Sequence, residues 1–152
     1  MTDQHRPRTR LVHAGTRRSQ YGETSEALFL TQGFLYPDAA AAEARFRGEM
    51  PEGSEGFIYA RYGNPTVAMF EERLAALEGG EDCFATASGM AAVHASLMCQ
   101  LRAGDHVVAS RALFGSCLWI LETLCPRFGI EVTLVDGADI AQWRAAMRPG
   151  TR

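Results

Sequence analysis

The stretch CFATASGMAAVHASLMCQL, residues 83–101, decides how this chain is expected to fold. Its first five residues, 83–87, form a short apolar run that is typical of a buried strand. The chain breaks at Ser88-Gly89, and apolar residues then recur at steps of three and four, at Met90, Val93, Leu97 and Leu101. Because that spacing places them on one helix face, the sequence predicts a strand that leads through a tight turn directly into a helix.

The turn at Ser88 and Gly89 is a candidate anion site. A helix that starts directly after a strand presents unpaired backbone N–H groups, and its dipole favours an anion there. Ser88 is a natural N-cap whose hydroxyl can add a donor. A purely structural turn is an equally open interpretation, because the chain has neither the three spaced glycines of a dinucleotide site nor the lysine of a Walker loop.

Two more strands are predicted downstream, at residues 106–110 and 130–135. One helix is expected from Ser116, ending or kinking at Pro126, and another after Asp139. Alternating strands and helices predict an α/β fold with a mainly parallel sheet and crossover helices. Ligands of such sheets bind beyond the carboxyl ends of the strands, where three loops are expected to meet at residues 88–89, 110–115 and 136–137.

Upstream of this sheet, the sequence predicts an arm rather than packed structure. Residues 1–27 are polar and arginine-rich without a sustained period, so an extended arm is expected there. The apolar patch at 28–31 could anchor it. Residues 38–46 fit a short helix, and the glycines of 48–56 indicate a loop or hinge.

The stretch FIYARYGNPT, residues 57–66, is the second informative one. It ends in a helix start, with Asn64 as N-cap and Pro65 at the first helical position, and Gly79 stops that helix. An aromatic loop with one arginine is most often a packing corner. The functional alternative is an anion clamp, in which the Arg61 guanidinium binds phosphate bidentately and the Tyr59 hydroxyl adds a donor.

The composition narrows the function classes. The chain has 152 residues, of which 47% are hydrophobic and 22% charged, and its net charge of -3 gives no support for nucleic-acid binding. No apolar run approaches the roughly 20 residues of a membrane span. The four cysteines form no C-x-x-C pair and the four histidines have no ligand spacing, so reduced thiols in a cytoplasmic protein and no metal site are expected. All fifteen basic residues are arginine.

Three motifs in this order resemble the PLP-dependent Cys/Met-metabolism (transsulfuration) enzymes. They are YARYGNPT at 59–66, LEGGE at 77–81 and ASGMAA at 87–92. Three further stretches carry a narrower resemblance to the O-succinylhomoserine sulfhydrylases of that family, namely TRLVHAG at 9–15, SEALFLT at 25–31 and SRALFGS at 110–116. The resemblance implies the fold of PLP-dependent transferases of type I. It divides the chain into an arm and clamp at 1–60 and an incomplete first part of the PLP-binding domain at 61–152, where a further strand is expected to begin near the end of the chain.

The resemblance also implies roles for six residues. The turn at Ser88, Gly89 and Met90 would hold the phosphate of pyridoxal 5'-phosphate, and Tyr59 and Arg61 would reach the same phosphate from a neighbouring subunit. A homo-oligomer is therefore expected, as a dimer of dimers. Phe114 would stack on the pyridine ring; many relatives have tyrosine there, which can also handle a proton.

The implied reaction is a γ-replacement in methionine biosynthesis, in which sulfide replaces the acyl group of an O-acylhomoserine to give homocysteine. It needs a Schiff-base lysine, and this chain contains none, so the chain alone is predicted to be inactive. Phenylalanine at position 114 favours the sulfhydrylases over the cystathionine γ-synthase and methionine γ-lyase branches. A non-catalytic phosphate-binding or assembly module is the alternative from another class.

Overall fold

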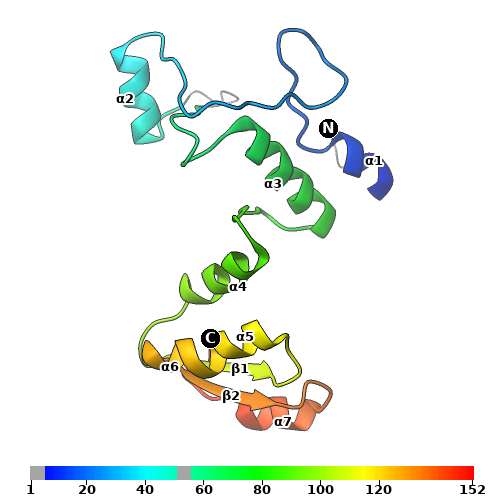
Figure 1. The fold of residues 1–152 in the computed structure, drawn as a ribbon, viewed down its shortest axis with the longest axis vertical. Coiled ribbons are helices and arrows are strands. Elements are labelled where there is room, and N and C mark those ends of the chain that lie inside the picture. Colours follow the sequence, from blue (N-terminus) through cyan, green and yellow to red (C-terminus); the bar gives the residue numbers. More distant parts are fainter. Residues whose placement is uncertain (1–5, 51–55) are drawn as a thin grey trace. The chain divides into compact units, whose positions relative to one another are not determined.

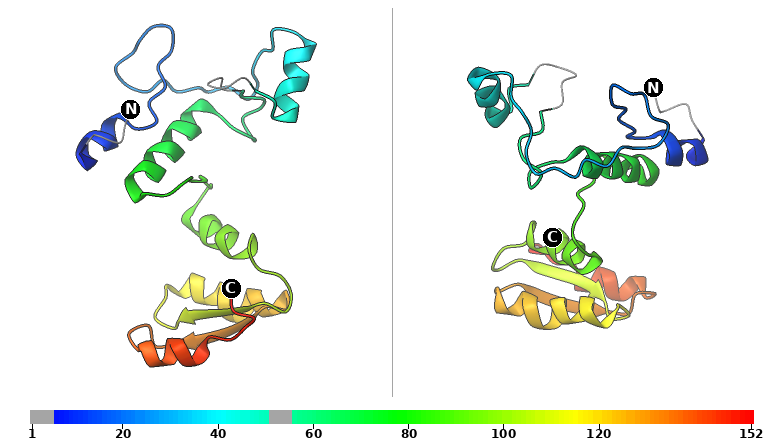
Figure 2. Two further views of the ribbon diagram at one scale, coloured as in Figure 1. Left: turned by 180° about the vertical axis from the view of Figure 1, so that it is seen from behind. Right: turned by 45° about the horizontal axis from the view of Figure 1, so that its top comes forward.

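The computed structural model describes residues 6–50 and 56–152, which divide into two compact units, Met1–Ala85 and Thr86–Arg152 (Figures 1 and 2). Each unit is described on its own. Unit 1 contains the helices α1 (Pro7–His13), α2 (Ala39–Arg47) and α3 (Pro65–Glu78). Unit 2 contains α4 (Gly89–Met98), β1 (His106–Ser110), α5 (Gly115–Trp119), a π-helical turn η1 (Ile120–Leu124), α6 (Cys125–Arg127), β2 (Glu131–Val135) and α7 (Ile140–Ala146).

Helix α3 begins and ends as its sequence predicts. The Asn64 side chain caps it, because its Oδ1 accepts the Thr66 N–H at 2.9 Å, and Pro65 occupies the first turn. Gly79 ends the helix in the left-handed conformation. Asn64 also donates its Nδ2 to the Phe29 carbonyl at 2.9 Å, which anchors the patch at 28–31 through its backbone.

The prediction that residues 1–27 form an extended arm without a packed element is wrong for residues 7–13, while residues 14–27 form no helix or strand. Residues 7–13 form α1, which contacts α3. The backbone that follows lies so close to α3 that a Cβ on Gly15 would come within 2.7 Å of the Met69 carbonyl oxygen. Arg73 of α3 donates to the Ala14 carbonyl at 3.0 Å and pairs with Glu26. Tertiary contacts of this kind order a segment whose own pattern predicts no structure.

The short helix predicted at 38–46 is confirmed as α2. Asp38 caps it by accepting the Ala41 N–H at 2.7 Å, and Gly48 follows its last residue. Of the loop predicted at 48–56, residues 51–55 lie outside the described residues, as do residues 1–5 of the predicted arm.

The sheet of unit 2 is parallel, as predicted. β1 and β2 pair in register from His106 opposite Glu131 to Ser110 opposite Val135. Residues beside Thr151 form a parallel bridge with His106, whose N–H donates to the Gly150 carbonyl at 2.9 Å and whose carbonyl accepts from Arg152 at 3.0 Å. β1 is therefore paired along one edge by β2, and its first residue has backbone partners on the other edge as well.

The strand predicted at 83–87 is not formed. Within the part of the chain that the structure describes, this segment pairs with no strand, and the Phe84 side chain is 84% exposed. Its amides find side-chain acceptors instead, with Ala85 N–H donating to Glu71 at 2.7 Å. An apolar run becomes a strand only where another strand takes up its backbone hydrogen bonds.

The helix predicted from Ser116 begins at Gly115 and continues past Pro126 to Arg127. In an α-helix the proline ring clashes with the carbonyl four residues earlier. For this reason the sequence predicts that Pro126 ends or kinks the helix. Here the preceding turn is π-helical, and Cys125 N–H bonds to the Ile120 carbonyl five residues back. The turn before the proline is therefore wider than an α-helical turn, and the helix ends at Arg127, one residue after Pro126.

The hydrophobic core of unit 2 lies against α4, the helix that follows the turn at Ser88-Gly89. Buried residues of β1, the π-helical turn and the start of β2 form one cluster, namely Val107, Ile120, Leu121, Cys125 and Ile130. Met90, Val93 and Leu97 of α4 pack on this cluster, and so does Leu101, which follows the helix. In Figure 1, α5 and α7 lie on opposite sides of the two strands, so that the α/β layering is formed.

Candidate functional site

The N-terminus of α4 has backbone donors that the described residues leave unused. Ser88 is extended, and its Oγ accepts the Ala91 N–H at 3.2 Å, while its carbonyl accepts from Ala92 at 3.0 Å. The N–H groups of Gly89 and Met90 have no acceptor within the described residues. The first turn carries no acidic side chain. Two backbone donors, the Ser88 hydroxyl proton and the helix dipole are therefore available to one anion.

Gly89 leaves space at this turn. A Cβ built on it would meet no protein atom within 4 Å, and its φ lies outside the left-handed region. The absence of a side chain at Gly89 is therefore demanded neither by packing nor by backbone strain. A ligand that approaches the backbone closely is a sufficient reason for glycine at this position.

The loop after β1 presents Phe114 at the carboxyl end of the sheet. Ser110 Oγ accepts the Ala112 N–H at 3.1 Å, and Arg111 N–H donates to the Val135 carbonyl at 2.9 Å. Phe114 is the N-cap residue of α5 and is 74% exposed. An exposed aromatic face at a strand end is available to stack on a planar ligand.

The helix α4 and the start of α5 share one groove. It has a volume of about 490 Å³ and is lined by Met90, His94, Gly115, Ser116 and Trp119 together with Ile120 and Leu124. Met90 and the residue that follows Phe114 thus lie at the same hollow. The structure therefore brings together the predicted turn at 88–90 and the predicted loop at 110–115, although residues 83–87 form no strand.

The predicted clamp is a tight turn in unit 1. Tyr62 and Gly63 both donate their N–H groups to the Tyr59 carbonyl, at 2.9 and 3.1 Å, and Tyr59 bridges to Gly33. Ala60 N–H donates to the Gln32 carbonyl at 2.8 Å. The turn is therefore fixed on the neighbouring backbone.

Arg61 projects from this turn between two aromatic rings. Its guanidinium carbon lies 5.1 Å from the centroid of the Tyr59 ring and 5.5 Å from that of Tyr62. No carboxylate or carbonyl of the described residues accepts a hydrogen bond from Arg61. Because its donors are unused and its side chain is held by stacking, Arg61 is prepared to bind an anion.

The six predicted site residues fall into two sets, one in each unit. Ser88, Gly89, Met90 and Phe114 belong to unit 2, and Tyr59 and Arg61 belong to unit 1. The sequence analysis did not include Tyr62 among the site residues. Its position directly after Arg61 could have indicated the contact between the two side chains. Trp119, whose side chain lines the groove beside Met90, was also missed.

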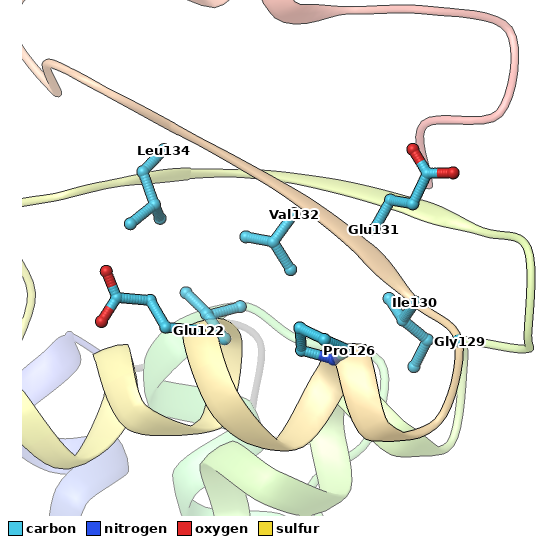
Figure 3. Close-up of a pocket in the computed structure, with 8 residues that line it drawn as sticks. Glu122, Pro126, Gly129, Ile130, Glu131, Val132 and Leu134 are labelled. Atoms are coloured by element: carbon cyan, nitrogen blue, oxygen red, sulfur yellow. The ribbon is translucent and has the colours of Figure 1, made fainter.

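A second hollow of about 830 Å³ runs beside β2 (Figure 3). Its lining is aliphatic except for two glutamates, Glu122 and Glu131. Glu131 pairs with Arg148, whose hydrogen bond and charge lower the pKa of that carboxyl. The lining of this hollow contains no cationic side chain that could bind an anionic ligand, so the hollow is not the candidate site.

Comparison with known proteins identifies relatives along almost the whole chain. A sequence model for "Cys/Met metabolism PLP-dependent enzyme" matches residues 8–152. An O-succinylhomoserine sulfhydrylase of Mycobacterium tuberculosis is 49% identical over 141 residues, covering 93% of this chain and 34% of the relative. An L-methionine gamma-lyase of Fusobacterium nucleatum is 40% identical over 144 residues, covering 95% of this chain and 35% of the relative.

A solved structure has the same fold. The Campylobacter jejuni protein assigned as an O-acetylhomoserine (thiol)-lyase, which carries a pyridoxyl-lysine phosphate group, superposes with a TM-score of 0.87 at 26% identity. The match covers 97% of this chain and 36% of that one. The chain thus spans about a third of the length of the relatives it matches. No helix in the described ranges 6–50 and 56–152 is both long and apolar enough to cross a membrane.

Proposed function

The chain belongs to the Cys/Met metabolism family of PLP-dependent enzymes, which have fold type I, and we propose that it is the N-terminal part of an O-succinylhomoserine sulfhydrylase. The identity of 49% to such an enzyme, against 40% to a methionine gamma-lyase, supports this branch. Phe114 supports it as well, because phenylalanine can stack on a ring but cannot exchange a proton. The proposed reaction breaks the Cγ–O bond of O-succinylhomoserine and forms a Cγ–S bond to sulfide, which gives homocysteine and succinate.

The phosphate of pyridoxal 5'-phosphate is proposed to bind at Ser88, Gly89 and Met90. The observation that carries this proposal is the turn before α4, with two unused N–H groups and open space at Gly89. A phosphate fits this donor set, because it accepts several hydrogen bonds and is stabilised by the helix dipole. The ring of Phe114 would lie against the pyridine ring and exclude water from that face. When bound, the cofactor supplies an electron sink for the substrate's Cα.

Tyr59 and Arg61 are proposed to complete the phosphate site of a neighbouring subunit. Their unused donors and the aromatic stacking of the guanidinium support a role as an anion clamp. The minimal active assembly would then be a dimer, and a dimer of dimers is proposed for the complete enzyme. A reducing cytoplasmic setting is part of the same proposal, supported by four free cysteines.

The phosphate site can be tested by replacing Gly89 with alanine. The added methyl meets no protein atom, so Gly89→Ala should fold at least as stably as the parent chain. It would fill the space proposed for the phosphate, and PLP affinity measured by equilibrium dialysis should fall about tenfold or more. Gly150→Ala is the control, because that glycine of unit 2 also has open space and does not line the groove between α4 and α5. Equal PLP affinity in Gly89→Ala and its parent would overturn the site.

The isolated chain is proposed to lack turnover, because none of its 152 residues is a lysine. Incubation with O-succinylhomoserine, sulfide and PLP should yield no homocysteine above the rate without protein. Release of homocysteine by the purified chain would contradict this proposal. Retention of PLP but not of pyridoxal, in a protein whose gene supplies no lysine downstream, would instead favour the alternative of a non-catalytic phosphate-binding module.

A further inference from the structure

The aromatic surroundings of Arg61 contain one residue that the proposed phosphate site does not use. Tyr62 approaches the guanidinium to 5.5 Å from its ring centroid, on a side chain that is 73% exposed. A tyrosine so exposed contributes little to a hydrophobic core. Its contact with Arg61 is its one aromatic or cation–π contact within the described residues.

The turn explains how two tyrosines meet one arginine. The hydrogen bonds from Tyr62 and Gly63 to the Tyr59 carbonyl close a tight reversal of the backbone. The side chains at positions 59, 61 and 62 are thereby brought together at one turn. The guanidinium of Arg61 is held by both rings rather than by a carboxylate, which keeps its charge and all its donors available.

We propose that Tyr62 is a positioning residue that holds the Arg61 guanidinium in the orientation in which it binds phosphate. The proposal deepens the proposed function and rests on it. A free arginine side chain loses much rotamer freedom when it binds an anion. Stacking against a second ring restricts that freedom before binding, so that less is lost when the phosphate arrives. The phenyl ring of Tyr62, and not its hydroxyl, is what the role requires.

The test is NMR of the 152-residue chain, with inorganic phosphate as the probe. The ring of Tyr62 should shift the Arg61 Hδ and Hε signals upfield through its ring current, independently of any ligand. Tyr62→Phe keeps the ring and should preserve both that shift and the phosphate affinity. Tyr62→Leu should remove the part of the shift that Tyr62 causes, leaving the part due to Tyr59. It should also weaken phosphate binding, followed at the Arg61 Nε signal, about two- to fivefold. Tyr21→Leu is the matched control, since Tyr21 is 85% exposed in the same unit.

The outcomes separate this inference from the proposed function. If Tyr62→Leu leaves the Arg61 signals and the phosphate affinity unchanged, Tyr62 has no positioning role. If Tyr62→Phe fails like Tyr62→Leu, the hydroxyl acts and ring stacking is the wrong account. If the parent chain shows the ring-current shift but binds no phosphate at Arg61, the clamp of the proposed function fails while the contact with Tyr62 stands.

Discussion

Asn64 serves two segments of unit 1 with one buried amide. Its oxygen caps α3, and its nitrogen donates to the carbonyls of Phe29 and Thr31. Asn64→Ala removes both and leaves buried backbone groups without partners, so unit 1 should lose about 1–3 kcal/mol. Asn64→Asp keeps the capping oxygen but not the amide donor. Its free energy of unfolding should therefore lie between those of the parent chain and Asn64→Ala.

Urea unfolding followed by tyrosine fluorescence measures the stability of unit 1 separately from that of unit 2. All four tyrosines precede Ala85, and both tryptophans follow Thr86. The tyrosine signal should therefore move to lower urea in Asn64→Ala. A change below about 0.5 kcal/mol would mean that the cap and the amide donor contribute nothing beyond an average surface site.

His106 is a buried histidine whose two ring nitrogens both have partners. It is 1% exposed, with Thr151 Oγ1 and Thr133 Oγ1 each at 2.8 Å. Burial lowers its pKa below the ordinary 6.5, the charge of Arg148 lowers it further, and Glu131 opposes them. Asp105 and Arg152 pair beside it at 3.8 Å.

This pKa direction predicts the pH dependence of unit 2. Because the unfolded chain binds the proton more readily, the stabilising contribution is fully present above pH 6.5 and is lost as the pH falls toward the folded pKa. Tryptophan-monitored stability should therefore decline between about pH 7 and 5. His106→Gln should flatten that decline, and the exposed His94→Gln should preserve it. Carboxylates with a lowered pKa, such as Glu131, change the stability of unit 2 only below about pH 4.5, where they begin to be protonated.

At the scale of elements, the predictable parts are those with local signals. Asn64, Pro65 and Gly79 mark α3 in the sequence and in the structure. Asp139 likewise marks the start of α7, because its side chain accepts the N–H groups of Ala141 and Gln142. The parallel pairing of β1 and β2 follows from their apolar runs and the helix between them. The turn at Ser88 was predictable for the same reason, because its cap and its helical period are local.

The elements that could not be predicted depend on partners distant in sequence. α1 lies in a polar segment and is held by contacts with α3, fifty to sixty residues away, such as Arg73 to Ala14. The run at 83–87 has strand composition but no strand beside it in the described residues. The stacking of Arg61 on Tyr62 depends on the backbone of one turn, which composition does not specify.

Gly15 is the place where the contact between the arm and α3 can be tested. Its φ is +69°, and a Cβ would lie 2.7 Å from the Met69 carbonyl oxygen, which is backbone and cannot move aside. Gly15→Ala should therefore detach α1 from α3 and destabilise unit 1 by about 1–3 kcal/mol. Gly22→Ala is its control for backbone strain alone, since Gly22 has φ +63° and open space. Equal loss in both variants would show that packing against α3 has no part in it.

At the scale of the whole molecule, the absence of lysine gives the chain a distinctive chemistry. Every one of its fifteen basic side chains is a guanidinium. Borohydride reduction in the presence of PLP should therefore fix no more than one pyridoxyl group, on the α-amine of Met1, and none after N-terminal acetylation. Mass spectrometry measures this directly. A second fixed group would show that another nucleophile of the chain reacts with the cofactor.

The pairing of β1 on both edges has a consequence for synthesis on the ribosome. Thr151, which bonds to the His106 ring, follows it by 45 residues. At roughly 5–20 residues per second, a nascent chain needs about two to nine seconds to make the segment that closes this edge. During that time β1 has at least one edge without a partner, and it has two until β2 is made. The interval therefore favours either chaperone contact or aggregation.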